Sequence, residues 1–140
     1  MRHDQDPTTQ QPTILLVDDE KFLRRLLARV LGGAGFDVVQ AENGAAALRA
    51  AVGLDGTLRL VVTDIHMPVM NGIEFAREFR PDHPTVPVLF ITGRDSAITD
   101  DPAYFDGHLR KPFRSEAFLA AVARLLDEGS ESLGQDHSVA

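Results

Sequence analysis

Short runs of apolar residues alternate along this chain with stretches in which apolar residues recur at helical spacing. Runs of four to six apolar residues predict strands that are covered on both faces, because such strands need no polar side. We predict strands at residues 14–17, 36–40, 58–63, 86–91 and 107–110, the second from alternation and the last from a short run. Helical spacing predicts helices over residues 21–31, 45–52, 73–79 and 115–126.

The helix predicted from Lys21 shows the spacing most clearly. Its arginines, Arg24, Arg25 and Arg29, fall outside the apolar face, and Gly32 and Gly33 are expected to end it. The apolar face itself consists of Phe22, Leu23, Leu26, Leu27, Val30 and Leu31.

The alternation of strands and helices with short connections determines the fold class. Each helical crossover returns the chain to the same end of the sheet, so the strands run parallel and helices cover both faces. The sequence therefore predicts an α/β domain. Residues 94–106 fit this pattern least, because Asp100-Asp101-Pro102 lies where a helix is expected.

Composition narrows the class of protein. A chain of 140 residues with 44% hydrophobic content supports one domain with a single sizeable core. The net charge of -7 offers no basic surface for nucleic acid and is repelled by anionic membranes. Cysteine is absent, which excludes disulfides and thiolate chemistry.

The two ends of the chain are polar. Residues 1–12 lack the apolar core of a signal peptide, and no stretch reaches the length of a membrane span, so we expect a cytoplasmic protein. Residues 1–12 and 129–140 are predicted to be disordered tails around one domain at residues 13–128.

Polar residues follow four of the predicted strands. Because the carboxyl ends of parallel strands meet at one edge of the sheet, these side chains are expected to converge there. They are Asp18 and Asp19 after the first strand, Asp64 after the third, Thr92 after the fourth and Lys111 after the fifth. Three carboxylates at one point repel one another unless a cation joins them, and oxygen ligands favour Mg²⁺. Beside a cation and an ammonium group, Asp64 could attack phosphorus as a nucleophile.

Each of these residues also has an ordinary structural interpretation. Asp18 or Asp19 could cap the helix that begins near Lys21, and Thr92 could make a local turn. Lys111 by itself would ordinarily be a solvated surface lysine. Their joint occurrence at strand ends favours a phosphoacceptor site.

Four motifs carry a family resemblance over residues 13–128. They are Ile-Leu-Leu-Val-Asp-Asp-Glu at 14–20, Asp-Ile-His-Met-Pro-Val-Met-Asn-Gly at 64–72, Ile-Thr-Gly at 91–93 and Lys-Pro-Phe at 111–113. In this order they resemble the CheY-like receiver domain of response regulators in two-component signalling. The resemblance implies a flavodoxin-like three-layer sandwich with strand order 2-1-3-4-5 and about five helices.

The resemblance also implies a role for each matching residue. Asp64 would be the phosphoacceptor, Thr92 would hydrogen-bond the phosphoryl group, and Lys111 would pair with a phosphoryl oxygen. The peptide bond between Lys111 and Pro112 is expected to be cis. Mg²⁺ would be the cofactor, held by Asp18, Asp19, Asp64 and the backbone carbonyl of His66.

Two departures from the family pattern affect how phosphorylation would change a surface that binds partners. His108 stands where a Tyr or Phe usually precedes the lysine, so it is either a switch residue that swings toward Thr92 or an exposed strand residue. The interval of 19 positions from Thr92 to Lys111 is shorter than usual in the family. The fourth helix is therefore predicted to be shortened, shifted or irregular. The side chain of His66 could line the mouth of the site or be a solvated loop histidine.

These features together predict a stand-alone receiver without a DNA-binding output domain. A histidine kinase or phosphotransfer protein would phosphorylate Asp64, and a phosphorylation-dependent surface would bind an unidentified protein target. We expect a monomer or weak dimer that assists its own phosphorylation and dephosphorylation and turns over no external substrate.

Three alternatives remain beside this prediction. The chain could be a pseudo-receiver that binds partners without phosphorylation, or a receiver excised from a larger hybrid kinase. A hydrolytic phosphatase is disfavoured, because such enzymes carry a second Asp two residues after the nucleophile, where this chain has His66.

Overall fold

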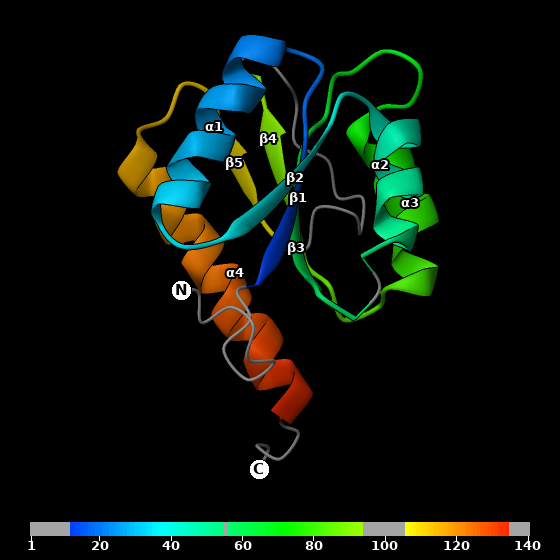
Figure 1. Cartoon of the computed structure of the whole chain (residues 1–140), viewed down its shortest axis with the longest axis vertical. Helices are drawn as coiled ribbons and strands as arrows, with labels where there is room; N and C mark the ends of the chain where they lie inside the picture. The colour runs from blue at the N-terminus through cyan, green and yellow to red at the C-terminus, as the bar shows by residue number, and fades with distance from the viewer. Residues whose placement is uncertain (1–11, 55, 94–105, 135–140) are drawn as a thin grey trace, which may run out of the picture.

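The computed structural model describes residues 12–54, 56–93 and 106–134. Within them, five parallel strands form one sheet in the order β2-β1-β3-β4-β5, which confirms the predicted sheet and its strand order (Figure 1). The strands are β1 (Thr13–Val17), β2 (Asp37–Ala41), β3 (Leu58–Asp64), β4 (Val88–Thr92) and β5 (His108–Arg110).

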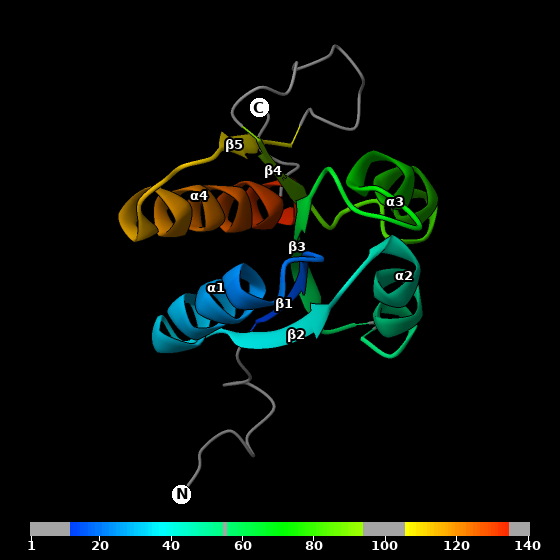
Figure 2. The same cartoon turned by 90° about the horizontal axis from the view of Figure 1, so that it is seen from above.

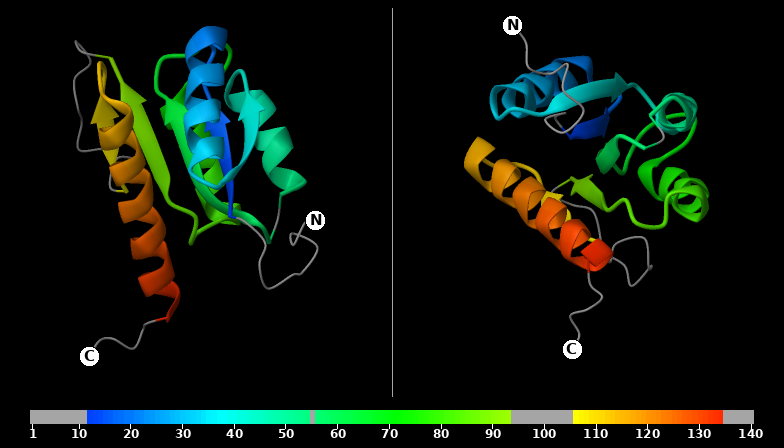
Figure 3. Two further views of the ribbon diagram at one scale, coloured as in Figure 1. Left: turned by 60° about the vertical axis from the view of Figure 1, so that its left-hand side comes forward. Right: turned by 60° about the horizontal axis from the view of Figure 1, so that its bottom comes forward.

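Helices cover both faces of the sheet, as a parallel sheet requires. Figure 2 and the right panel of Figure 3 show α1 and α4 on one face and α2 and α3 on the other. The described helices are α1 (Lys21–Gly33), α2 (Gly44–Val52), α3 (Gly72–Phe79) and α4 (Ser115–Gly134), with a 3₁₀ turn, η3 (Arg80–Asp82), after α3.

Strand β1 lies inside the sheet, between β2 and β3, and all five of its residues are buried. Successive side chains of a strand point to opposite faces. Ile14 and Leu16 accordingly pack in the core under α1 and α4, whereas Leu15 and Val17 pack in the core under α2 and α3. The continuous apolar run at the first strand is therefore explained by two separate cores, one on each face.

The apolar face predicted for the first helix is wider than the face that the structure buries. Leu27 and Leu31, one turn apart, are buried against the sheet, but Phe22 is 77% exposed and Leu26 is 45% exposed. The sheet contacts only a narrow stripe of α1, so residues displaced by one position around the helix face solvent. Arg24, predicted outside the apolar face, is half-buried.

Several element boundaries differ from the predicted ones for local reasons. The fourth strand begins at Val88 rather than at residue 86, because Pro87 has no N–H to donate to the sheet; its carbonyl accepts from the Val61 N–H at 3.0 Å. Helix α3 begins at Gly72 with Asn71 as N-cap and a capping box completed by Glu74. Helix α4 continues to Gly134, past the predicted domain boundary at residue 128.

The predicted irregular fourth helix falls on residues 94–105, which lie outside the described part of the chain. The described residues accordingly contain four α-helices of the five or so that were predicted. None of these helices is both long enough and apolar enough to span a membrane.

Candidate functional site

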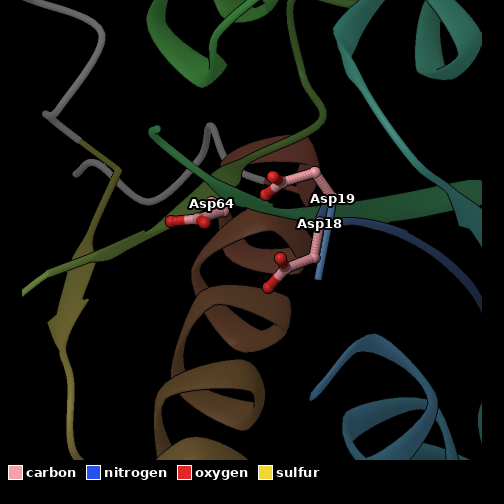
Figure 4. A group of neighbouring side chains, drawn as sticks. All are labelled: Asp18, Asp19 and Asp64. Atoms are coloured by element: carbon pink, nitrogen blue, oxygen red, sulfur yellow. The ribbon is translucent and has the colours of Figure 1, made fainter. Parts of the chain in front are cut away.

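Three carboxylates converge at the carboxyl end of the sheet. Asp18 and Asp19 directly follow β1, and Asp64 is the last residue of the neighbouring strand β3 (Figure 4). One oxygen from each of the three side chains lies within 4.8 Å of the other two. The predicted convergence of these acids is thus present in the structure, at a spacing that one cation can bridge.

Hydrogen bonds of its own backbone and side chain hold Asp18 in place in the turn after β1. Its N–H donates to the carbonyl of Ala41 at the end of β2, at 3.1 Å. Its Oδ1 accepts from the N–H of Glu20 at 2.9 Å. Asp18 is only 1% exposed, whereas the adjacent Asp19 is exposed. One carboxylate therefore forms the buried floor of the site and the other its solvent-facing wall.

Asp64 is held at a defined angle by its neighbours. Its Oδ1 accepts from the N–H of Ile65 at 2.9 Å, and its Oδ2 lies 3.6 Å from Nζ of Lys111. The hydroxyl of Thr63 donates to the Asp64 carbonyl at 2.9 Å. The side chain of Asp64 thus keeps one oxygen toward the backbone and the other toward an ammonium group.

Burial and mutual repulsion both act on these carboxylates. Burial, together with the charges of Asp64 and Asp19, raises the pKa of Asp18 to about 6, against lowering contributions from the Glu20 N–H and from Lys111. Burial likewise raises the pKa of Asp64, although Lys111, the Ile65 N–H and His66 lower it. A bound divalent cation would offset this cost, so the donor set fits Mg²⁺, a hard cation that prefers oxygen ligands.

Thr92 and Lys111 lie on the adjacent strand ends. The Thr92 side chain is fully buried, and its hydroxyl has no hydrogen-bond partner among the described residues. The Thr92 carbonyl accepts from the Lys111 N–H at 2.8 Å, which ties the ends of β4 and β5 together. The peptide bond between Lys111 and Pro112 is cis, as predicted.

The two histidines singled out from the sequence are both exposed. His66 lies two residues after Asp64, and its charge contributes to lowering the pKa of that carboxyl. His108 is the first residue of the edge strand β5, where it is in register with Phe90 of β4. The structure therefore places His108 two residues along the strand from Arg110, the register partner of Thr92.

The loop between Asp64 and α3 packs tightly against the rest of the site. A side chain at Gly72 would overlap the Asp64 carbonyl, and the Gly72 N–H donates to the carbonyl of Ile65 at 2.9 Å. The Met70 N–H closes a three-residue turn on the Pro68 carbonyl at 2.7 Å, with Val69 between them at φ 72°. A β-branched residue rarely adopts this left-handed conformation, so Val69 is strained next to the site.

Sequence reasoning missed two residues that shape the site. Arg24 was placed on the solvent side of the first helix, yet its Nη1 donates to the carbonyl of Asp18 at 2.9 Å. Gly72 was noted only as the end of a motif. The signal for Arg24 was an arginine one turn into a helix that begins at an acidic loop, and for Gly72 it was a glycine beside an N-cap asparagine.

Comparisons with known proteins agree with this geometry. The family model described as "Response regulator receiver domain" matches residues 14–123. The chain is 32% identical over 125 residues to "DNA-binding transcriptional regulator NtrC" of Escherichia coli (strain K12), covering 87% of this chain and 26% of that protein. It is 34% identical over 119 residues to "Sensor kinase CckA" of Brucella abortus (strain 2308), covering 83% of this chain and 13% of that protein.

Solved structures show the same likeness. The response regulator protein TrrA from Thermotoga maritima, in complex with Mg²⁺-BeF, superimposes with a TM-score of 0.73 at 32% identity, over 82% of this chain and 99% of that one. This chain spans only about a quarter of the regulator NtrC and about an eighth of the kinase CckA. The match to the family model covers most of the chain and includes every strand end of the site. The chain belongs to the response regulator receiver domain family.

Proposed function

We propose that the protein accepts a phosphoryl group on Asp64 and holds Mg²⁺ with Asp18, Asp19, Asp64 and the backbone carbonyl of His66. The observation that carries this proposal is the convergence of three carboxylate oxygens within 4.8 Å of one another, with Lys111 Nζ 3.6 Å from Asp64 Oδ2. Carboxylates gathered in this way repel one another and so do not stabilise the fold. Beside an ammonium group at the carboxyl edge of a parallel sheet, they are suited to phosphoryl transfer.

Asp64 forms the new bond. A carboxylate oxygen of Asp64 attacks phosphorus, while the bond from phosphorus to the donor breaks and the leaving group departs with the electron pair. The Ile65 N–H keeps Oδ1 in place during this step, and the Lys111 ammonium neutralises charge on the transferred oxygens. Magnesium, when bound, supplies further positive charge to the same oxygens.

Thr92 supplies a hydrogen-bond donor for the transferred phosphoryl group. Its hydroxyl is buried without a partner among the described residues, and an unsatisfied buried hydroxyl costs about 1–3 kcal/mol. A phosphoryl oxygen on Asp64 would give this hydroxyl an acceptor. The Thr92 carbonyl accepts a hydrogen bond from the Lys111 N–H at 2.8 Å. A shift of Thr92 would therefore move the end of β5. This link is the route by which phosphorylation would alter a protein-binding surface.

The phosphoryl donor in this proposal is a protein. Receiver domains are phosphoacceptor signalling domains that interact with histidine kinases or phosphotransfer proteins, and they do not turn over external substrates. For this chain we propose a phosphohistidine donor, a downstream protein target, and assistance by the site in its own phosphorylation and dephosphorylation. The receiver domain is proposed to comprise residues 13–128, with the last part of α4 extending beyond it to Gly134.

Labelling with acetyl phosphate tests the proposal directly. The wild-type protein should gain one phosphoryl group per chain when Mg²⁺ is present, and none when EDTA replaces it. Asp64→Asn should abolish labelling, whereas the matched control Asp37→Asn, an exposed carboxylate on β2, should leave it unchanged. Labelling that persists in Asp64→Asn would refute the assignment of Asp64, and a wild-type protein that is never labelled would favour a pseudo-receiver.

A further inference from the structure

Arg24 differs from the other arginines of α1 in where its side chain lies. Arg25 and Arg29 are exposed, but Arg24 is half-buried and points toward the carboxyl edge of the sheet. Its Nη1 donates to the Asp18 carbonyl at 2.9 Å, and its Nε donates to Oε1 of Gln40 at 3.1 Å. One guanidinium thus joins α1 to the end of β1 and to β2.

The contact from Arg24 completes the set of hydrogen bonds around Asp18. The Asp18 N–H donates to Ala41 at 3.1 Å, Oδ1 accepts from the Glu20 N–H at 2.9 Å, and the carbonyl accepts from Arg24 at 2.9 Å. Among the described residues these bonds do not involve Oδ2, which can therefore face a cation. Two of the three partners are backbone groups, so Arg24 supplies the side-chain restraint.

The start of α1 lacks a side-chain cap. Glu20, the N-cap residue, makes no side-chain capping bond, and the first turn of α1 contains no acidic residue. Helix α3, by contrast, begins with a capping box made by Asn71 and Glu74. The turn that carries Asp18 and Asp19 is therefore held from inside the helix, one turn further along, by Arg24.

We propose that Arg24 is a positioning residue for the divalent cation: it holds the turn of Asp18 and Asp19 so that their carboxylates meet Asp64. This inference rests on the proposed Mg²⁺ site. Residues that orient metal ligands in this way typically change metal affinity by about 10–100-fold when they are removed. Arginine suits the role because its rigid fork serves two acceptors at once, which a lysine ammonium on a flexible stem does less well.

Titration of the ¹⁵N-labelled full chain with Mg²⁺ alone, followed by amide chemical shifts, tests the proposal without any phosphorylation. Arg24→Ala should raise the Kd for Mg²⁺ about tenfold, and Arg24→Lys should give an intermediate value. Gln40→Ala, which removes only the second anchor, should raise the Kd about twofold. Arg25→Ala removes the same charge from an exposed neighbour and should leave the Kd unchanged.

A second measurement separates positioning from general stability. In acetyl phosphate labelling, Arg24→Ala should raise the Mg²⁺ concentration at half-maximal rate about tenfold but change the rate at saturating Mg²⁺ less than twofold. Urea unfolding in EDTA reports any loss of stability independently. If Arg24→Ala fails to fold, Arg24→Lys and Gln40→Ala still carry the test.

Two results would overturn the inference. One is a Kd for Mg²⁺ that stays at the wild-type value in Arg24→Ala or, where that variant does not fold, in both substitute variants. The other is an equal loss of affinity in Arg25→Ala, which would assign the effect to net charge. If the wild type binds Mg²⁺ with the predicted dependence on Arg24 but is never labelled, the proposed phosphoacceptor function fails while the positioning role stands.

Discussion

Replacing Asp18 with asparagine should stabilise the fold at neutral pH when no divalent cation is present. Asp18 is 1% exposed, and burial with neighbouring negative charge raises the pKa of its carboxyl from 3.8 to about 6. A raised folded-state pKa means that the stability associated with protonated Asp18 is complete below pH 3.8. It is lost as the pH rises through about 6.

The size of this effect follows from the shift. At about 1.36 kcal/mol per pKa unit, moving from 3.8 to about 6 costs the folded state about 3 kcal/mol above pH 7. Asparagine avoids ionisation and can still accept the Glu20 N–H through its amide oxygen. Because burying the amide also carries a cost, we expect a net gain of about 1–3 kcal/mol in the free energy of unfolding.

Urea unfolding in EDTA from pH 4.5 to pH 8 measures the prediction. The chain has no tryptophan, so circular dichroism is the appropriate signal. The advantage of Asp18→Asn should grow as the pH rises through about 6 and then level off. Asp19→Asn, at an exposed carboxylate, should give a smaller gain. Saturating Mg²⁺ should stabilise the wild type by RT ln(1 + [Mg²⁺]/Kd) and stabilise Asp18→Asn much less.

Equal stability of the wild type and Asp18→Asn at pH 8 in EDTA would refute this reasoning. A gain that does not change between pH 4.5 and pH 8 would refute it as well. The first result would mean that the buried carboxylate carries no ionisation cost, and the second that the gain has a cause other than charge.

Three further perturbations probe the surroundings of the site. Gly72→Ala should lower the free energy of unfolding by about 1–3 kcal/mol in urea, because the added methyl would overlap the carbonyl of Asp64; wild-type stability would contradict the tight packing seen there. At Val69, with φ 72°, glycine should be more stable than alanine by about 1 kcal/mol in the same assay, and the usual preference for alanine would show that this turn is not strained. Lys111→Met should raise the pKa of Asp64 further, measured from its carboxyl ¹³C shift in EDTA, since the ammonium group 3.6 Å away holds that pKa down; an unchanged pKa would mean that the pair is fully screened.

The sequence predicted the sheet well because a strand that is buried on both faces consists almost entirely of apolar residues. A run such as residues 14–17 has no polar position, which is the pattern of a strand covered by helices on both faces. The strand order came from the family resemblance, not from the pattern, because apolar runs do not say which strands are neighbours. The first helix was predicted in place, but its buried face was drawn too wide at Phe22 and Leu26.

The membership of the site could also be predicted from the sequence. The strands that end at one edge bring these residue types together: Asp64 and Thr92 are the last residues of their strands, and the others directly follow theirs, namely Asp18, Asp19 and Lys111. Spacing along the chain cannot say which of two adjacent aspartates is buried, since both follow the same strand. The structure buries Asp18 and exposes Asp19.

By itself, then, the sequence determined which residue types stand at the ends of the parallel strands, and it predicted a cation and a phosphoryl group as their ligands. Tertiary structure decided how each of them is held: Arg24 reaching back to the Asp18 carbonyl, Gly72 lying against the Asp64 carbonyl, and the Thr92 hydroxyl buried without a partner among the described residues. The physical reason is that periodicity reports only whether a position is covered. Which atoms cover it depends on segments far apart in the chain, and only the folded structure brings those together.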